Sequence, residues 1–224
     1  MRRLVFIALL VGLLGCQTSQ PAVEPAATTA PVAEPASPPA DPGVRVLFDG
    51  TSRANWTETN FGFDGSTSLE DSLLVLDMTD YMAGVTWTGD ALPTLNYEIT
   101  WEAKRVDGGD FFSAITFPVG DGHMSFINGG WGGSIIGLSS IDGLDASENE
   151  TRNFRRFQSD QWYAFRLRVT DTDINIWINE RPVVEFEHAG RVLSIRVEMD
   201  NSRPLGFASW RTQSALRNIQ LRTL

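Results

Sequence analysis

Polar and apolar side chains alternate with a period of two along much of this chain, and this pattern restricts its fold more than any other feature. In residues 97–104, YEITWEAK, the apolar positions are Tyr97, Ile99, Trp101 and Ala103. In residues 162–170, WYAFRLRVT, Arg166 and Arg168 alternate with Phe165, Leu167 and Val169. Because successive side chains of a β-strand point to opposite faces, both segments are predicted to be strands with one buried face.

A hairpin is predicted over residues 173–187, DINIWINERPVVEFE, with its turn around Asn179 and Glu180. The side chains expected to face the core are Ile174, Ile176, Ile178, Val184 and Phe186. Trp177 lies between two of these isoleucines, so it is predicted to point outward, away from the core.

Short strands separated by turns rich in glycine and aspartate recur along residues 44–224, and no segment carries a convincing helical stripe. We therefore predict an all-β domain over these residues, built as a two-sheet sandwich of jelly-roll type. All seven tryptophans of the chain fall in this region, so a sizeable core is available. We find no internal repeat.

The first residues predict export and lipidation. A charged start with two arginines precedes the apolar run LVFIALLVGLL, which is too short to span a bilayer and is typical of a secretory signal. Residues 13–16, LLGC, resemble a bacterial lipobox, so we predict a signal peptide over residues 1–16 and a lipid anchor on Cys16, the only cysteine. An ordinary cleaved signal is the alternative. Gln17 is compatible with an outer-membrane location in the cell envelope.

Residues 17–43 are predicted to be a disordered tether between this anchor and the domain. They are rich in proline, alanine, threonine and serine and contain no aromatic residue, so they cannot bury enough apolar surface to fold. In a polyproline-like conformation the tether could extend roughly 80 Å. Disorder without a spacing role would produce the same sequence.

The charge balance argues against a nucleic-acid partner. The formal net charge is −10, and no basic stripe is present. Lys104 is the only lysine, so nearly all positive charge is arginine, which suits planar hydrogen-bonding partners such as carboxylates or sugar hydroxyls.

Three segments together resemble a known family. They are VLFDGTSRANW (residues 46–56), YEITWEAKRVDGGDFFSAITF (97–117) and RPLGFASWRTQSALRNIQL (203–221). In order and spacing they resemble the start, centre and end of the 3-keto-disaccharide hydrolase family. The resemblance implies a concanavalin A-like sandwich, related to laminin G domains, and activity on 3-keto glycosides. The chain departs from many relatives at Phe111 and Phe112, where they carry Asn-Ser-Gly.

Several common hydrolase sites are missing from the sequence. The nearest approach to the Glu-x-Asp-x-x-Glu strand of glucanases is EMDNSR, residues 198–203, which ends in Arg203 where the acid should stand. No Gly-x-Ser-x-Gly motif occurs, and two histidines are too few for a typical zinc site.

A 3-keto sugar requires less catalytic machinery, because the ketone acidifies the hydrogen at carbon two and a single base can start an elimination. The candidate base is His123. It shares a strand face with Ser125 and Ile127, opposite Met124 and Phe126, and is therefore predicted to face away from the core. The alternative is a surface or structurally hydrogen-bonded histidine.

Trp131, within GGWGG, is the candidate platform for a sugar ring, because the surrounding glycines allow close approach to the backbone. The alternative is a tryptophan that fills a gap between the sheets. Arg152 and Trp177 are the further candidate sugar-binding residues.

An acidic segment follows Trp131. Asp142, Asp145 and Glu148 supply oxygen ligands that would suit calcium or another divalent ion, although the spacing is not that of an EF-hand. No cofactor is required by the sequence. The alternatives are a solvated loop, or neutralisation by the arginines that follow, which are Arg152, Arg155 and Arg156.

Three functions remain open from the sequence. The first is a lipid-anchored, extracytoplasmic hydrolase of 3-keto glycosides that acts by elimination and hydration. The second is a non-catalytic, lectin-like module that binds glycans. The third is a structural lipoprotein that binds other proteins.

Overall fold

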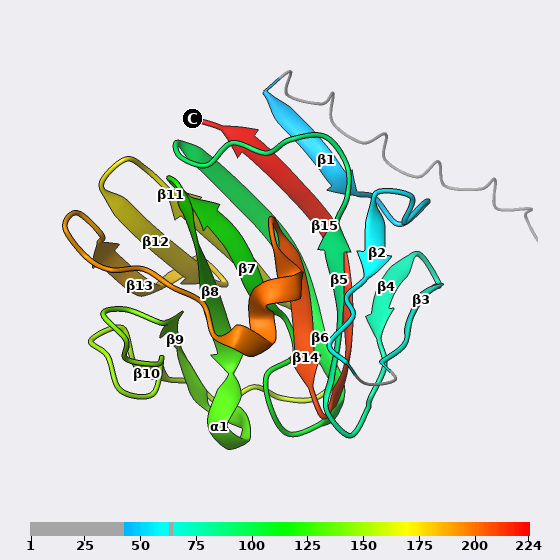
Figure 1. Ribbon diagram of the computed structural model, residues 1–224. Coiled ribbons are helices and arrows are strands. Elements are labelled where there is room, and N and C mark those ends of the chain that lie inside the picture. The colour runs from blue at the N-terminus through cyan, green and yellow to red at the C-terminus, as the bar shows by residue number, and fades with distance from the viewer. Residues whose placement is uncertain (1–42, 63–64) are drawn as a thin grey trace, which may run out of the picture. The chain divides into compact units, whose positions relative to one another are not determined.

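The computed structural model describes residues 43–62 and 65–224 (Figure 1). The predicted signal peptide, the lipid anchor on Cys16 and all of the tether except Gly43 lie outside the described residues and remain predictions. Within the described residues, no helix is both long enough and apolar enough to cross a membrane.

One sheet has eight strands and forms one layer of a sandwich. Seven of them follow the order β13-β12-β11-β6-β15-β4-β3, and β1 pairs with β15. Their bounds are β1 (Val44–Phe48), β3 (Thr67–Glu70), β4 (Leu73–Leu76), β6 (Tyr97–Gly108), β11 (Tyr163–Val169), β12 (Asp173–Ile178), β13 (Arg181–Glu187) and β15 (Thr212–Thr223).

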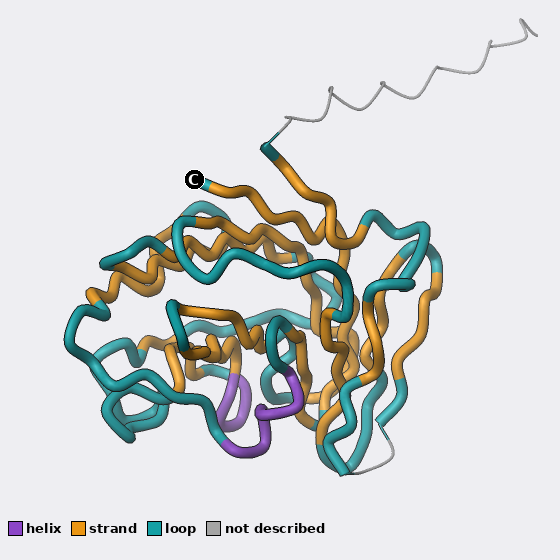
Figure 2. The backbone as a smooth tube through the Cα atoms, turned by 45° about the horizontal axis from the view of Figure 1, so that its top comes forward, coloured by secondary structure: helices purple, strands orange, loops and turns teal. Residues whose placement is uncertain are grey.

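The second sheet has seven strands in the order β10-β9-β8-β7-β14-β5-β2. Their bounds are β2 (Trp56–Glu58), β5 (Met82–Trp87), β7 (Ala114–Val119), β8 (Gly122–Gly129), β9 (Ile135–Ser139), β10 (Asn153–Phe154) and β14 (Gly206–Trp210). A short helical turn, α1 (Gly130–Gly133), follows β8, and a 3-10 helix, η1 (Val197–Ser202), precedes β14. Both turns lie on the same side of the sandwich (Figure 2).

The strand pairs are antiparallel, and the predicted all-β sandwich of two sheets is confirmed. The side chains predicted to face the core from β6 and β11 are all buried. Trp101 lies opposite Phe165 in the register of these strands, and their rings stack with centroids 4.9 Å apart. Phe207 of β14 contacts Trp101 from the other sheet at 5.5 Å, so aromatic rings join the two layers.

The predicted hairpin is also confirmed. Asn179 and Glu180 both have a positive φ, of 50° and 59°, as a two-residue turn between twisted strands requires. The predicted inward side chains of β12 and β13 are buried in the core. Trp177 points outward on the opposite face, as its position in the alternation predicts, and is only partly buried.

The outer face of the seven-stranded sheet carries small side chains along one row. The row consists of Thr86, Gly206, Thr116, Ser125 and Ser139. The connection between β13 and β14, residues 188–205, crosses over this row, and Thr86 donates a hydrogen bond to the carbonyl of Asn201 (2.9 Å). A Cβ on Gly206 would lie 2.7 Å from the carbonyl oxygen of Ser202, so only glycine permits this close approach.

Candidate functional site

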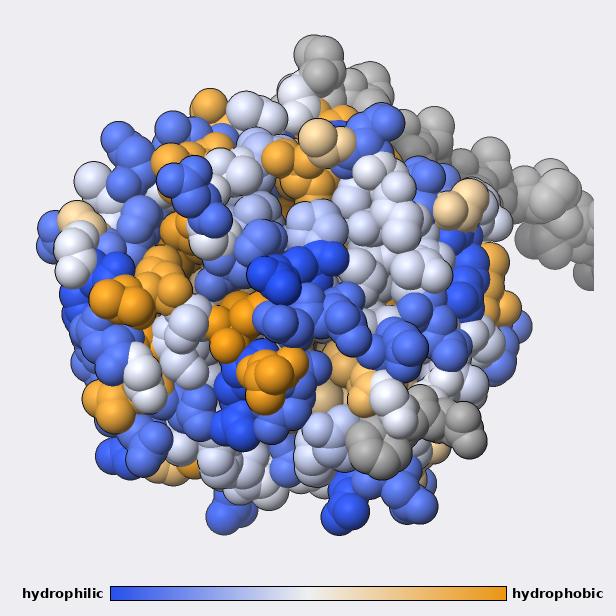
Figure 3. Space-filling model, viewed as in Figure 1, coloured by the Kyte–Doolittle hydropathy of each residue, from blue (hydrophilic) through white to orange (hydrophobic). Residues whose placement is uncertain are grey.

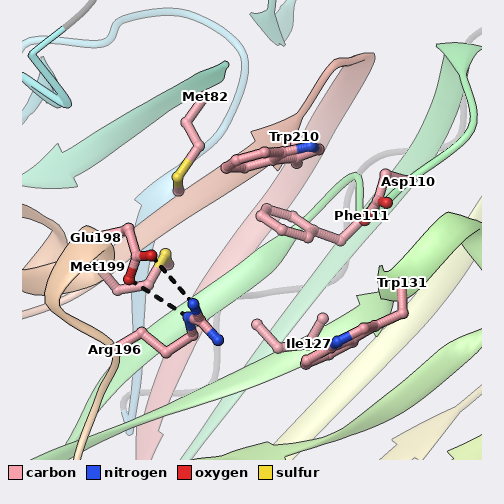
Figure 4. A pocket seen from close by; sticks show the side chains of 9 residues that line it. All are labelled: Met82, Asp110, Phe111, Ile127, Trp131, Arg196, Glu198, Met199 and Trp210. Carbon is pink, nitrogen blue, oxygen red and sulfur yellow. Dashed lines mark hydrogen bonds and ion pairs between the residues drawn. The ribbon is translucent and has the colours of Figure 1, made fainter. Parts of the chain in front are cut away.

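A pocket of about 270 Å³ opens on the outer face of the seven-stranded sheet, beside the β13–β14 connection. Its walls come from three sheet strands, from the loop before β7, from α1 and from the connection (Figure 4). The residues that line it are Met82, Asp110, Phe111, Ile127, Trp131, Arg196, Glu198, Met199 and Trp210. On the face shown in Figure 3, hydrophobic groups lie among hydrophilic ones, and Trp131 is 44% exposed.

The glycines around Trp131 build a tight turn that presents its indole at this pocket. Trp131 has a left-handed backbone (φ 51°), and the glycines on its C-terminal side also have positive φ. A Cβ on Gly133 would lie 2.6 Å from the carbonyl oxygen of Gly109, so that position requires glycine. The carboxylate of Asp110 accepts a hydrogen bond from the Gly132 amide (2.9 Å) and so holds the turn closed.

Arg105 supports the same turn from beneath. This arginine is 6% exposed and donates hydrogen bonds to the carbonyls of Asp110 (3.1 Å) and Gly133 (3.5 Å). Its guanidinium lies over the ring of Phe112, 5.4 Å from the centroid. The position of Trp131 is therefore set by charged and aromatic groups as well as by the glycines.

An arginine–carboxylate pair forms the polar side of the pocket. Arg196 binds Glu198 through two hydrogen bonds, from Nη2 to Oε1 (3.1 Å) and from Nε to Oε2 (3.4 Å). The hydrogen bond from Arg196 lowers the pKa of Glu198 below its ordinary value, so this carboxylate is ionised at neutral pH. A negative and a positive group are thus fixed side by side at the edge of an otherwise apolar pocket.

Asp145 connects this pair to the acidic segment. Its carboxylate accepts hydrogen bonds from Ser139 Oγ (3.0 Å) and Ser140 Oγ (2.9 Å) and forms an ion pair with Arg196. The structure therefore brings one predicted metal ligand next to the pocket, where it anchors an arginine.

The three predicted metal ligands do not converge. Asp142 pairs with Arg191 (2.7 Å), Asp145 pairs with Arg196, and Glu148 is exposed. Within residues 43–62 and 65–224, no group of three or more His, Cys, Asp or Glu side chains is placed to hold a metal ion. The geometry therefore does not support the calcium interpretation.

The sequence also pointed to the wrong arginines for neutralising these acids. The neutralising side chains come from the distant β13–β14 connection, where Arg191 also binds Glu150 (2.6 Å). Of the arginines that follow the segment, Arg152 binds the carbonyl of Ser147 (3.1 Å). The ring of Tyr163 lies 5.3 Å from the Arg155 guanidinium.

Two predicted sugar-binding residues lie away from the pocket. Trp177 lies on the outer face of the other sheet, with the guanidinium of Arg166 3.8 Å from its ring centroid. Arg152 does not line the pocket, and its guanidinium lies over Phe154 (5.7 Å). Neither residue therefore lines the pocket with Trp131, and Trp177 belongs to a different sheet because β12 pairs with β11 and β13.

His123 faces away from the core, as predicted, but does not line the pocket. It stands at the start of β8, six residues before Gly129 and therefore roughly 20 Å from the end of the strand that leads to Trp131. Its Nε2 is buried and makes no hydrogen bond to the described residues. Burial, and secondly the charge of Arg203, lower the pKa of His123, so the ring is neutral at pH 7.

Sequence reasoning missed most of the residues that form the pocket. Glu198 belongs to the EMDNSR segment, which fails as a strand motif and forms η1 instead. Phe111 and Phe112 are adjacent aromatic residues, and only Phe112 enters the main core. Because two adjacent aromatic side chains cannot both enter the core, Phe111 could have indicated the site. No comparable signal in the sequence indicated that Met82 and Trp210 contribute to the pocket.

Comparison with solved structures shows the same fold at low sequence identity. The Crh5 transglycosylase in complex with NAG matches with a TM-score of 0.58 and 9% identity, over 81% of this chain and 84% of that chain. A protein of unknown function with a galectin-like fold from Bacillus subtilis matches with a TM-score of 0.53 and 11% identity, over 75% and 89%. The carbohydrate recognition domain of Emp47p matches with a TM-score of 0.51 and 12% identity, over 81% and 95%.

Among curated proteins, none matches this sequence. The family profile described as the 3-keto-alpha-glucoside-1,2-lyase-like domain matches residues 43–222, which cover most of the chain and include all three of the segments that suggested the family. The chain therefore belongs to the family of 3-keto-alpha-glucoside-1,2-lyase-like domains.

Proposed function

We propose that the protein binds 3-keto glycosides at this pocket and cleaves them by elimination followed by hydration. The observation that carries the proposal is the Arg196–Glu198 pair, which faces the same pocket as Trp131. A flat indole suits the apolar face of a sugar ring. The ion pair provides a carboxylate and a cation beside that ring.

In the proposed reaction, the Glu198 carboxylate removes the proton from carbon two of the sugar. The adjacent ketone takes up the resulting charge as an enolate, and Arg196, the cation among the pocket residues, stabilises its oxygen. The enolate then expels the group at carbon one, whose oxygen leaves with the bonding electrons and takes up the proton held by Glu198. Water adds across the new double bond, with hydroxide at carbon one and a proton at carbon two, and releases the free 3-keto sugar.

Glu198 replaces His123 as the candidate base because of position. A general base must reach the proton that it removes within hydrogen-bonding distance. Glu198 lines the pocket with Trp131, whereas His123 lies near the opposite end of β8. The neutral His123 ring remains chemically able to accept a proton. Mutation of Glu198 and of His123 therefore distinguishes which of the two residues is the base.

The test is an assay of the purified protein with methyl 3-keto-α-glucoside and with the unoxidised parent glucoside. We expect cleavage of the keto sugar alone, because only the ketone acidifies the proton at carbon two. Glycoside binding without cleavage of the keto sugar would contradict the enzymatic proposal and favour a glycan-binding module. Absence of both would favour a structural, protein-binding role.

We further propose that the protein acts in the cell envelope, held by a lipid on Cys16. The support is the lipobox-like sequence LLGC after a secretory signal. Growing cells with an alkyne fatty acid should label the wild type and not Cys16→Ser, and the variant should move to the soluble fraction. A wild type that is soluble and unlabelled would contradict the anchor.

A further inference from the structure

The pocket has an apolar end that the proposed sugar chemistry does not use. Met82, Phe111 and Trp210 lie together at this end, and the Arg196–Glu198 pair lies at the side formed by the β13–β14 connection (Figure 4). Ile127 and Met199 complete the apolar wall, and both belong to a cluster of apolar side chains on this face. Apolar side chains therefore form most of the lining.

The polar groups of the pocket already have partners within the protein. The Asp110 carboxylate accepts hydrogen bonds from the amides of Phe111 (2.8 Å) and Gly132 (2.9 Å). Arg196 is shared between Asp145 and Glu198. A sugar that entered the apolar end would lose hydrogen bonds from its hydroxyls to water and find few replacements.

The volume of the whole pocket and the side chains of its apolar end suit an aromatic ring. An apolar cavity of about 150 Å³ is sufficient to bind benzene, so the 270 Å³ of this pocket can hold one substituted six-membered ring. Phe111 and Trp210 have ring centroids 6.4 Å apart and planes tilted by 46°. Thioether groups, supplied here by Met82 and Met199, make favourable contacts with aromatic rings.

The charge at the pocket selects against anionic ligands. Two carboxylates, those of Asp145 and Glu198, bind the Arg196 guanidinium, and the Asp110 carboxylate lines the pocket as well. An acidic group on the ligand would meet an excess of negative charge, so the ring is expected to be uncharged.

We infer that the apolar end of the pocket binds an uncharged aromatic aglycone, with the sugar at the mouth between Trp131 and the Arg196–Glu198 pair. This inference rests on the proposed function and narrows it to glycosides of aromatic alcohols. A disaccharide would place its second, hydroxyl-rich unit against Met82, Phe111 and Trp210, whose side chains offer a single hydrogen-bonding group, the indole N–H of Trp210.

The test is calorimetric titration of the full-length protein in the Glu198→Gln background, which should keep the ligand intact. Methyl and phenyl 3-keto-α-glucosides are compared directly. The phenyl glycoside should bind at least about tenfold more tightly, because the additional ring buries apolar surface. Phe111→Ser should remove most of that preference, and Phe154→Ser should keep it, because Phe154 is 64% exposed and does not line the pocket.

Thermal melting of each double variant checks that its fold is intact. The comparison of the two ligands in Glu198→Gln alone does not depend on the folding of the Phe111→Ser and Phe154→Ser variants. Equal affinity for both glycosides would overturn the aglycone inference and leave glycoside binding in place. A phenyl preference that survives in folded Phe111→Ser would overturn the assignment to this pocket. No binding of either glycoside would contradict the proposed function itself, and cleavage in the Glu198→Gln background would contradict only the choice of base.

Discussion

The strands of both sheets alternate inward and outward side chains, but the outward side chains of the two sheets are covered in different ways. On the eight-stranded sheet, Glu98 is buried and is surrounded by Arg166, Arg168 and Arg222, which lie on the same sheet. On the seven-stranded sheet, small side chains leave room for the β13–β14 connection and for the pocket. The first face is crossed by ion pairs among its own strands and has a cavity of about 170 Å³ beside Glu98, whereas the second face is completed by a distant segment.

The difference depends on whether the residue that pairs with an outward side chain comes from an adjacent strand or from a distant segment. Glu98 lies directly opposite Arg168 on β11 and Arg222 on β15, so regular strand pairing brings the charges together. Trp177 is covered in the same way by Arg166, which lies opposite it on the paired strand. Asp145 and Arg196, in contrast, are 51 residues apart and meet only because the connection crosses the sheet. A binding surface is therefore expected on the part of a sheet where the outward side chains are not paired with side chains of the neighbouring strands.

The largest expected effect is on activity at the seven-stranded face. Glu198→Gln should lower kcat for a 3-keto glucoside by about 10²–10⁴-fold, because it removes the proposed general base while keeping a similar shape. Steady-state kinetics would measure this loss. Glu102→Gln, which removes the carboxylate bound to Arg217 on the other face, is the matched control and should keep the wild-type rate. Similar losses in both variants would remove the functional distinction between the faces.

The next effect is on stability at the eight-stranded face. Glu98→Ala should lower the free energy of unfolding by about 2–4 kcal/mol, because three arginines lose a buried partner while their own side chains still reach water. Urea denaturation would measure it, with activity per folded molecule unchanged. Glu180→Ala removes a carboxylate whose side chain is 81% exposed and should cause no measurable change. An undiminished stability of Glu98→Ala would show that this network does not hold the sheet.

The two outward tryptophans offer a smaller contrast. Trp131→Ala should raise KM about tenfold and change kcat much less, if the indole contacts the sugar equally in the ground and transition states. Trp177→Ala should leave both constants unchanged, because its ring is covered by Arg166 on the other sheet. Direct binding of the ligand to each variant separates KM from affinity. A larger loss from Trp177→Ala would move the site to the eight-stranded face.

The smallest expected effect is at His123. Replacing it by alanine should keep kcat within about twofold, because the proposed base is Glu198, which lines the pocket, whereas His123 does not. Since the pKa of Glu198 is lowered, the rate should be constant near neutrality and fall only as pH drops through that lowered value. The acid limb of the pH profile should therefore be the same in wild type and His123→Ala. A large loss of rate in this variant would restore His123 as the base.

The sequence was sufficient to predict several of the strands and the faces of their side chains. A period of two depends only on strand geometry, and the chain carries that period clearly in β6, β11 and β12. The same alternation predicted that Trp177 and His123 face away from the core. The choice of Trp131 rested on a different signal, the glycines around it, which allow close approach to the backbone.

The composition of the pocket depended on tertiary structure. Alternation specifies the face of a side chain within its own strand, but not which distant segment will cover that face. The role proposed for Glu198 depends on its contact with Arg196, and Asp145 meets the same arginine from a distant part of the chain. Local geometry, which depends on bonded neighbours, was readable from the sequence, whereas contacts between segments far apart in the chain were decided by the packing of the whole sandwich.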